Sequence, residues 1–144
     1  MQIEGYGLKM NLPAGWDGRI TRDSPKDAVV LQAASTELAP GDVTGVETHR
    51  RMRNTDLYLK VIDIGAPTAR LVDHDPAWSR EALPIRFGTE HIYDTFEDVE
   101  LPAYGARAVA VDGHALMVYV GFGSFPSQAD VARANAVLAS FSVD

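Results

Sequence analysis

Hydrophobic and polar residues alternate on both sides of a Pro-Ala-Gly sequence near the N-terminus, in residues 5–20 (GYGLKMNLPAGWDGRI). Apolar residues at every second position are typical of strands with one buried face. Pro13 suits the first central position of a type I turn, and Gly15 suits the left-handed position that closes a hairpin loop. The pattern therefore predicts an antiparallel hairpin with Trp16 as a core anchor. The pairs expected on its buried face are Leu12 with Trp16, Met10 with Gly18, and Leu8 with Ile20.

A second hairpin is predicted where residues 105–111 and 114–123 flank Asp112-Gly113. This dipeptide strongly favours a two-residue type I′ turn, which fixes the register of the strands beside it. The pairs on one face are then Val111–His114, Val109–Leu116 and Arg107–Val118. The pairs on the other are Ala110–Ala115, Ala108–Met117 and Ala106–Tyr119. Because small side chains let another element come close, we expect that the alanine face is covered too.

The segments between the hairpins are less regular. Residues 28–35 read as a central strand with two apolar faces, residues 37–47 as a loop, and residues 57–65 as a further strand. In the last of these, Lys60 shares a face with Tyr58, Ile62 and Ile64.

Residues 66–84 hold several prolines and little periodicity, with a short helix expected around 76–83. Residues 84–88 are expected to form a short edge strand. Residues 91–102 are expected to pair at the margin of the sheet.

An amphipathic helix is predicted in residues 127–143, because Val131, Ala134, Leu138 and Phe141 recur at helical spacing. Ser127 suits the N-cap, with Asp130 three positions further on, close to a capping box. The last residues are expected to form a short strand or an extended tail. Together these elements predict an α+β fold, with an antiparallel sheet built from hairpins and a C-terminal helix packed on it.

Composition narrows the range of functions. A chain of 144 residues suggests a single domain, 1–144, and it has no cysteine, which excludes disulfides, thiolate metal sites and cysteine nucleophiles. The net charge of -7 argues against nucleic-acid binding, which normally needs a basic stripe. No apolar run is long enough to span a membrane, and the first residues lack the pattern of a signal peptide. If Met1 is the natural start, a cytoplasmic location is expected.

The two ends of the chain resemble the PsbP/Mog-like superfamily. At the N-terminal end the resemblance rests on Leu12, Pro13, Gly15 and Trp16, and at the C-terminal end on Leu138, Ser140, Phe141 and Val143. The superfamily includes the photosystem II subunit PsbP, Ran-binding Mog proteins, bacterial lipoproteins and chaperones of type VI secretion effectors. The layout is also similar to that of small actinobacterial proteins. The resemblance implies an antiparallel sheet with flanking helices and a binding role without a shared active site, so it assigns no functional residue.

No catalytic, cofactor or metal site is predicted from the sequence. His49, His74, His91 and His114 are far apart and fall in no metal-ligand spacing, and Asp73-His74-Asp75 reads as a solvated loop. No serine lies in a nucleophile-elbow motif, and the G-x-G pairs lack the third glycine of a phosphate-binding loop. Glu97, Asp98 and Glu100 lie in one segment, without a second carboxylate placed across a cleft.

Two clusters of charge are the strongest remaining feature. One is basic and consists of Arg50, Arg51 and Arg53; the other is acidic and consists of Glu90, Asp94, Glu97, Asp98 and Glu100. Complementary charge steers association and fixes register, so the clusters are candidate docking sites for another protein or for a second copy of the chain. The alternative is that they are ordinary solvated faces, or that the basic loop and the acidic edge segment pair with each other within the chain, because exposed charges contribute little on their own.

Three hypotheses of function follow. The first is a non-enzymatic protein-interaction or accessory domain that docks through Arg50, Arg51 and Arg53 or through Glu97, Asp98 and Glu100, with no cofactor, no nucleic acid and no membrane span. The second is a binding protein for a small apolar molecule, held between the alanine strip and residues 66–84. The third is an enzyme with an unrecognised site that uses His74 or His91.

Overall fold

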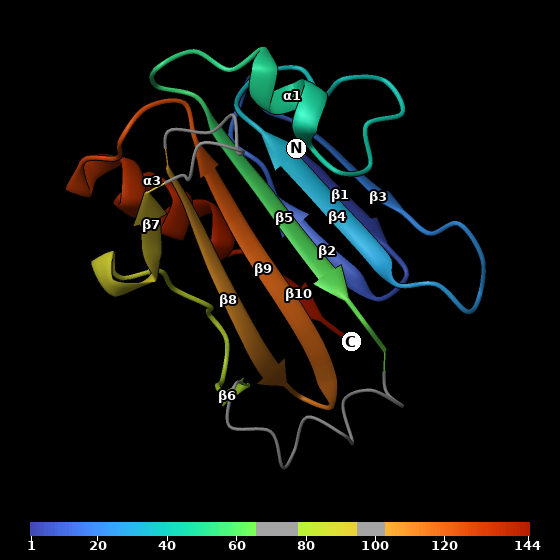
Figure 1. Ribbon diagram of the computed structural model, residues 1–144. Helices are drawn as coiled ribbons and strands as arrows, with labels where there is room; N and C mark the ends of the chain where they lie inside the picture. The colour runs from blue at the N-terminus through green and yellow to red at the C-terminus, as the bar shows by residue number, and fades with distance from the viewer. Residues whose placement is uncertain (66–77, 95–102) are drawn as a thin grey trace.

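The computed structural model describes residues 1–65, 78–94 and 103–144, in which two β-sheets and their flanking helices are arranged in layers (Figure 1). The strands are β1 (Gln2–Gly5), β2 (Leu8–Asn11), β3 (Asp17–Thr21), β4 (Val29–Ala34), β5 (Leu57–Asp63), β6 (Ser79–Arg80), β7 (Ile92–Asp94), β8 (Ala103–Val111), β9 (His114–Phe122) and β10 (Ser142–Val143). The helices are α1 (Val46–Arg50), the 3-10 turn η1 (Thr89–His91) and α3 (Gln128–Leu138).

The larger sheet has the strand order β3-β4-β5-β9-β8-β6, with β7 also paired to β8, and the smaller sheet has the order β1-β2-β10. Among the described strands, the pairing of β6 with β8 is parallel and the others are antiparallel. This architecture confirms the predicted α+β class, with a mostly antiparallel sheet and a C-terminal helix.

The main core lies on one face of the larger sheet, where α3 and the smaller sheet cover it (Figure 1). Leu57, Leu59 and Val61 of β5 point into this core, since alternate residues of a strand share a face. The residues that meet them from the covering layer are Leu8, Met10, Leu12, Val131, Ala134, Val137, Leu138 and Phe141. The opposite face of β5 presents Tyr58 and Lys60 toward α1, and the candidate sites lie on that side.

The second hairpin forms as predicted, with every predicted pair in register. Asp112 (φ 47°) and Gly113 (φ 81°) are both left-handed, as a type I′ turn requires, so the local turn chemistry sets the alignment of both strands. The predicted strands within 28–35 and 57–65 also form. The predicted helix begins at Gln128, after the Ser127 N-cap, but it ends at Leu138, so Phe141 lies beyond it. Ser127 and Asp130 make the expected capping box, and the chain ends in the short strand β10.

The predicted pairing of the first hairpin, residues 8–12 with residues 16–20, is wrong. The turn itself forms, with Gly15 at φ 82° and the Trp16 amide donating to the carbonyl of Pro13 at 3.2 Å. However, β2 pairs with β1 and β10, whereas β3 pairs with β4, so the two strands lie in different sheets. Both strands bury apolar side chains in one core from opposite layers, which produces the same alternation as a hairpin. Instead, β2 forms a hairpin with the preceding strand β1, and the turn between them contains Tyr6 (φ 52°) and Gly7 (φ 82°).

The two sheets approach each other closely at Gly18. A Cβ atom at this position would lie 2.5 Å from Leu12 Cδ1 and 3.0 Å from Ile3 Cδ1. Both neighbours belong to the smaller sheet or to the turn that follows it. The absence of a side chain at Gly18 therefore allows the layers to pack together, while Trp16, partly buried beside them, packs against the core as predicted.

Residues 78–88 differ from the prediction. The expected helix around 76–83 is absent from the described residues 78–83, where β6 is extended and Glu81 N donates to Ala110 O at 3.2 Å. The expected edge strand at 84–88 is also absent. Instead, the amide of Phe87 donates to Asn135 Oδ1 at 2.7 Å, and Asn135 Nδ2 donates to Phe87 O at 2.9 Å. A side-chain amide of α3 thus occupies the backbone groups that a neighbouring strand would bind. Within the predicted marginal strand at 91–102, residues 92–94 form β7, and residues 95–102 lie outside the described residues.

The alanine face of the second hairpin is covered only in part by described residues. Ala106, Ala108 and Ala110 are half-buried, and Ala115 is buried beside Ile64 and Trp78. In the described part of the chain, α1 and the loop before it lie over the other end of this face (Figure 1).

Candidate functional site

The predicted arginines lie at the end of α1 and in the loop that follows it, here called the arginine loop (residues 50–53). Arg51 and Arg53 are exposed, whereas Met52 between them is half-buried. Met52 packs against the small cluster formed by Ala34, Leu38 and Tyr58. This inward methionine fixes the position of the loop and leaves the arginines on either side of it at the surface.

The backbone that follows the arginine loop is held by neighbours from three parts of the chain. Asp56 caps it, because the Arg53 amide donates to Asp56 Oδ2 at 2.7 Å. The further contacts are Asp56 N to Arg53 O (3.0 Å), Ser124 Oγ to Asn54 O (2.8 Å), Arg133 Nη1 to Thr55 O (3.0 Å) and Gly123 N to Asp56 O (3.1 Å). The basic side chains are therefore carried by a fixed backbone, which lowers the entropy that a partner has to remove on docking.

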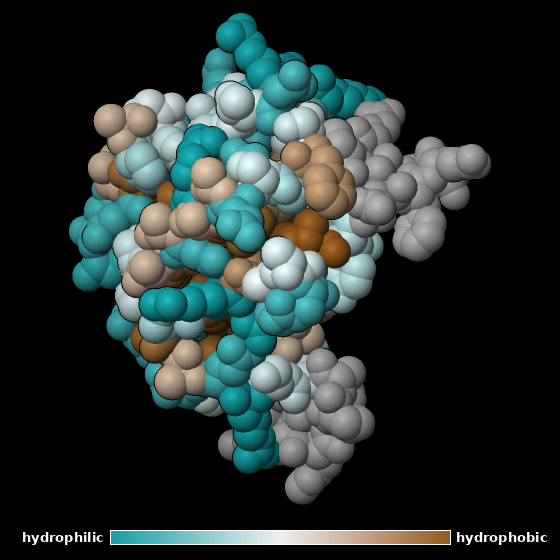
Figure 2. Space-filling view, turned by 90° about the vertical axis from the view of Figure 1, so that its left-hand side faces the viewer, coloured by the Kyte–Doolittle hydropathy of each residue, from teal (hydrophilic) through white to brown (hydrophobic). Residues whose placement is uncertain are grey.

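Hydrophilic side chains gather at the top of the molecule in Figure 2, the end at which α1 and the loop after it lie in Figure 1. Arg50 forms an ion pair with Glu47 (2.8 Å) in which both side chains are about half exposed. Such exposed pairs are weak and can exchange partners. The acidic residues Glu97, Asp98 and Glu100 lie outside the described residues, so their role as a docking site stays a prediction.

A buried polar network centred on Asp42 attaches α1 to the larger sheet. The carboxylate of Asp42 accepts the amides of Gly45 and Thr48, both at 2.9 Å. Its backbone carbonyl accepts Gln32 Nε2 at 2.7 Å and Arg19 Nη2 at 2.6 Å. Burial acts to raise the pKa of Asp42, but the hydrogen bonds from Thr48 and Gly45 outweigh it and lower the pKa below its usual value. The charged carboxylate therefore holds the loop in place.

A cavity of about 260 Å³ lies beside this network, between α1 and strands β5, β8 and β9. We call it the tyrosine–lysine pocket. The side chains that give it its chemistry are Thr44, Val46, His49, Lys60, Tyr104 and Tyr119. Its walls are largely aromatic and aliphatic, with the polar groups few and at defined positions, as in most ligand sites.

Lys60 is the cation of the tyrosine–lysine pocket. Its Nζ donates to the carbonyl of Thr44 at 3.1 Å and lies 5.0 Å from the centre of the Tyr119 ring, a cation–π distance. Burial lowers the pKa of Lys60, and the negative charge of Asp42 opposes that shift. Burial also raises the pKa of Tyr119, so its hydroxyl stays protonated at neutral pH.

His49 forms the inner wall of the same pocket. Its ring meets Tyr58 edge to face, with 4.5 Å between centroids, and its buried Nε2 has no hydrogen-bond partner in the described part of the chain. A Cβ atom on Gly121 would lie 2.7 Å from this nitrogen, so a glycine is needed there. Burial and the charge of Lys60 lower the pKa of His49 to about 4, against the opposing effect of Asp42. The imidazole is therefore neutral at physiological pH.

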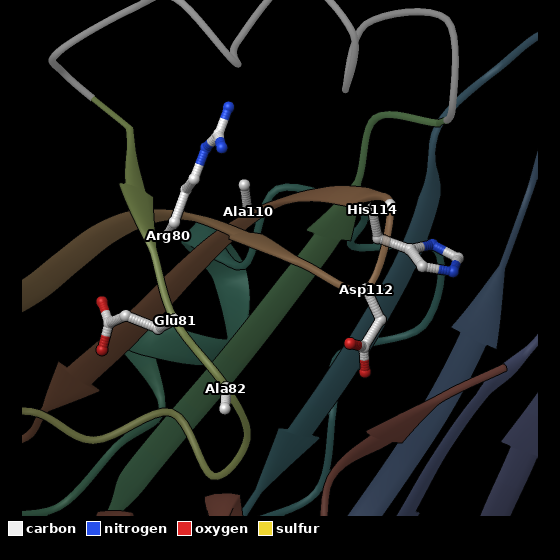
Figure 3. A pocket seen from close by; sticks show the side chains of 7 residues that line it. Arg80, Glu81, Ala82, Ala110, Asp112 and His114 are labelled. Carbon is white, nitrogen blue, oxygen red and sulfur yellow. The ribbon is translucent and has the colours of Figure 1, made fainter.

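A wider cavity of about 350 Å³ lies at the other end of β8 and β9, and Figure 3 shows it from close by. Arg80 and Glu81 enter from β6 and the residue after it, while Asp112 and His114 lie across from them at the hairpin turn. In Figure 3 the charged groups of Arg80 and Glu81 point in different directions, and Glu81 is ion-paired with Arg107. The charged side chains do not converge on one point, as a bound substrate would require.

The described histidines outside the tyrosine–lysine pocket are used in structural bonds. His114 Nδ1 lies 2.8 Å from Asp63 Oδ2, and its Nε2 lies 2.7 Å from the backbone oxygen of Asp144. Burial acts to lower the pKa of His114, but the hydrogen bonds to Asp63 and Asp144 outweigh it and raise the pKa. His91 Nδ1 accepts the Gly88 amide at 2.9 Å. His74, the other histidine of the enzyme hypothesis, lies outside the described residues.

Comparisons with known proteins do not assign the chain to a group: no family model, no curated protein and no solved structure matches it. Residues 1–65, 78–94 and 103–144 contain no cluster of three or more histidine, cysteine or acidic side chains able to hold a metal ion. None of the helices in these ranges is long and apolar enough to cross a membrane.

The tyrosine–lysine pocket was not predicted from the sequence. Its members come from residues 44–49, 58–60, 104 and 119–121, segments that only the folded sheet brings together. One signal was present, since Lys60 is a lone charge on a strand face that it shares with Tyr58 and Ile62. A charge in such a position is unusual without a partner or a function.

Proposed function

We propose that the protein is a non-enzymatic interaction domain that docks an acidic surface of another protein through the arginine loop. The observation that carries this proposal is the exposure of Arg51 and Arg53 on a backbone held by Met52, Asp56 and Arg133. Arginine is well suited to such a role, because its planar guanidinium forms paired hydrogen bonds with carboxylates.

Electrostatics favours the same site. The chain has a net charge of -7, so a cluster of arginines is a local exception in a negative field. A partner with an acidic patch is attracted to this end of the molecule and repelled elsewhere, which fixes its orientation. The structural use of both nitrogens of His114, and of Nδ1 in His91, also favours binding over catalysis.

The PsbP/Mog-like resemblance of the chain ends supports a binding role as well, since the members of that superfamily act by binding. We include this architecture in the proposal, on the basis of the same residues at the first turn and in the segment from the end of α3 to β10.

The test is affinity capture of the tagged protein from lysate of its source organism, followed by purification of the captured protein. The first variant carries Arg50→Glu, Arg51→Glu and Arg53→Glu. The control carries Lys9→Glu, Lys26→Glu and Arg86→Glu, three exposed positions elsewhere that give the same change in net charge. We expect that the wild type and the control retain one acidic partner and that the first variant loses it.

Two results would overturn the proposal. Capture that is unchanged in the first variant would show that the arginines do not dock a partner. Equal loss in both variants would show a general effect of charge, without a defined site. Sedimentation of the purified protein distinguishes docking between copies, because the wild type would then be a dimer and the first variant a monomer.

A further inference from the structure

The tyrosine–lysine pocket has features of a ligand site that lies apart from the arginine loop. We propose that it binds a small aromatic molecule that carries a carboxylate group. The site is on the face of the larger sheet that Figure 1 shows toward the viewer, where α1 covers one end. This inference is independent of the docking proposal, because the two sites use different side chains.

Lys60 carries a positive charge that the described residues satisfy only in part. A lysine ammonium has three N–H donors, and here one of them is accepted by Thr44 O at 3.1 Å. No carboxylate in residues 1–65, 78–94 or 103–144 lies within ion-pair distance of Lys60 Nζ. A half-buried charge without a counter-ion is costly, and the cost is reduced when an anion binds beside it. The remaining donors of Lys60, which no described residue accepts, thus favour an anionic ligand in a protein that is otherwise acidic.

Aromatic side chains form much of the wall of the tyrosine–lysine pocket. The ring of Tyr119 in β9 faces the Lys60 ammonium. Tyr104 lies on the neighbouring strand β8, where it pairs with Gly121, two residues after Tyr119. Tyr93 of β7 contacts the Tyr104 ring with 5.6 Å between centroids and so supports it. Aromatic rings attract another ring in offset or edge-to-face contact. Val46, which is 47% exposed, adds an aliphatic edge from α1.

The volume of the tyrosine–lysine pocket suits a small ligand. A volume of about 260 Å³ lies just below the ~300 Å³ at which pockets for drug-sized molecules begin, so it suits a molecule with a single ring. A single cation suits one carboxylate better than a polyphosphate, which needs several cations or a cradle of backbone amides. His49 shapes the inner wall without taking part in charge recognition, because its Nε2 faces Gly121.

The experiment is an amide NMR titration of the ¹⁵N-labelled protein at pH 7 with benzoate, benzamide and benzylamine as probes. These molecules share one ring and differ in charge. We expect saturable shifts around Lys60, Tyr119 and Gly121 with benzoate, weaker shifts at the same residues with benzamide, and none with benzylamine. No saturable shift with benzoate up to about 10 mM, or equal affinity for all three probes, would overturn the proposal.

Three variants make the test specific. Lys60→Met keeps the aliphatic stem and removes the charge; it should weaken benzoate binding about tenfold and leave benzamide binding unchanged. Lys26→Met removes an exposed lysine elsewhere and should leave the affinities for benzoate and for benzamide unchanged. Tyr104→Leu should weaken the binding of benzoate and of benzamide about two- to tenfold, because it removes ring contacts without changing charge. Equal benzoate affinity in the wild type and Lys60→Met would contradict the proposal, and the amide spectrum of each variant reports directly whether it is folded.

Discussion

Replacing His49 with leucine should remove much of the sensitivity of this fold to mild acid. The imidazole is packed against Tyr58, its Nε2 is buried against Gly121, and the charges that act on its pKa are those of Lys60 in β5 and Asp42 in the preceding loop. Burial and Lys60 hold its pKa at about 4, compared with 6.5 for an unperturbed histidine. Below pH 6.5 the unfolded chain therefore takes up a proton that the native protein does not bind.

The sign and the size of the effect follow from this difference in pKa. The native pKa of His49 lies below its pKa in the unfolded chain. The stability that the neutral imidazole contributes is therefore complete above pH 6.5 and is lost as the pH falls toward 4. The shift from 6.5 to about 4 corresponds to ~3 kcal/mol at ~1.36 kcal/mol per pH unit. By pH 4.5 about 2.5 kcal/mol of this stability should already be lost.

The assay is urea unfolding followed by tryptophan fluorescence at pH 7.5 and pH 4.5. The wild type should lose about 2.5 kcal/mol more of its free energy of unfolding than His49→Leu between the two pH values. Met52→Leu is the control, because it alters the neighbouring cluster and leaves the histidine in place, so it should keep the full pH dependence. If His49→Leu and the wild type lose the same stability, the imidazole is not buried in the neutral form and the description of this wall of the pocket is wrong.

Two further predictions concern how the layers are joined. Gly18→Ala should lower the free energy of unfolding, measured by thermal denaturation, by about 1–3 kcal/mol, because a methyl group would collide with Leu12 Cδ1. Gly5→Ala is the control and should lower it little, because the nearest atom to its added Cβ lies at 3.7 Å. Similar losses in the two variants would contradict the close approach of the sheets. Asn135→Ala should cost about 2–3 kcal/mol, because it leaves both backbone groups of Phe87 without their partner. Hydrogen exchange of the Phe87 amide should then accelerate more than exchange in β9, and an unchanged rate would show that Asn135 does not hold this segment.

The sequence was sufficient where structure depends on near neighbours. Asp112-Gly113 adopts the left-handed angles of a type I′ turn, and the register of β8 and β9 follows from that turn alone. Ser127 and Asp130 begin α3 through bonds that lie within a few residues. The strands β4 and β5 were likewise readable, because runs of apolar residues are typical of central strands.

The sequence was insufficient to predict the structure where the partner of a segment lies far away in the chain. Alternation in residues 8–12 and 16–20 correctly indicates buried faces, but a shared core between two sheets produces the same alternation as one hairpin. The segment around Phe87 depends on Asn135, a residue that reads only as one position of a helix. The arginine loop could be found as a charge cluster, whereas the tyrosine–lysine pocket required the order β5-β9-β8 to bring its side chains together.

Docking of an acidic partner by the arginine loop is best tested by measuring the affinity of the purified partner at two salt concentrations. Calorimetric titration would compare the wild type, the variant with Arg50→Glu, Arg51→Glu and Arg53→Glu, and the control with Lys9→Glu, Lys26→Glu and Arg86→Glu. We expect that the first variant binds at least about tenfold more weakly and loses most of the salt dependence, while the control matches the wild type. Equal affinities in the wild type and the first variant, with the same salt dependence, would contradict it.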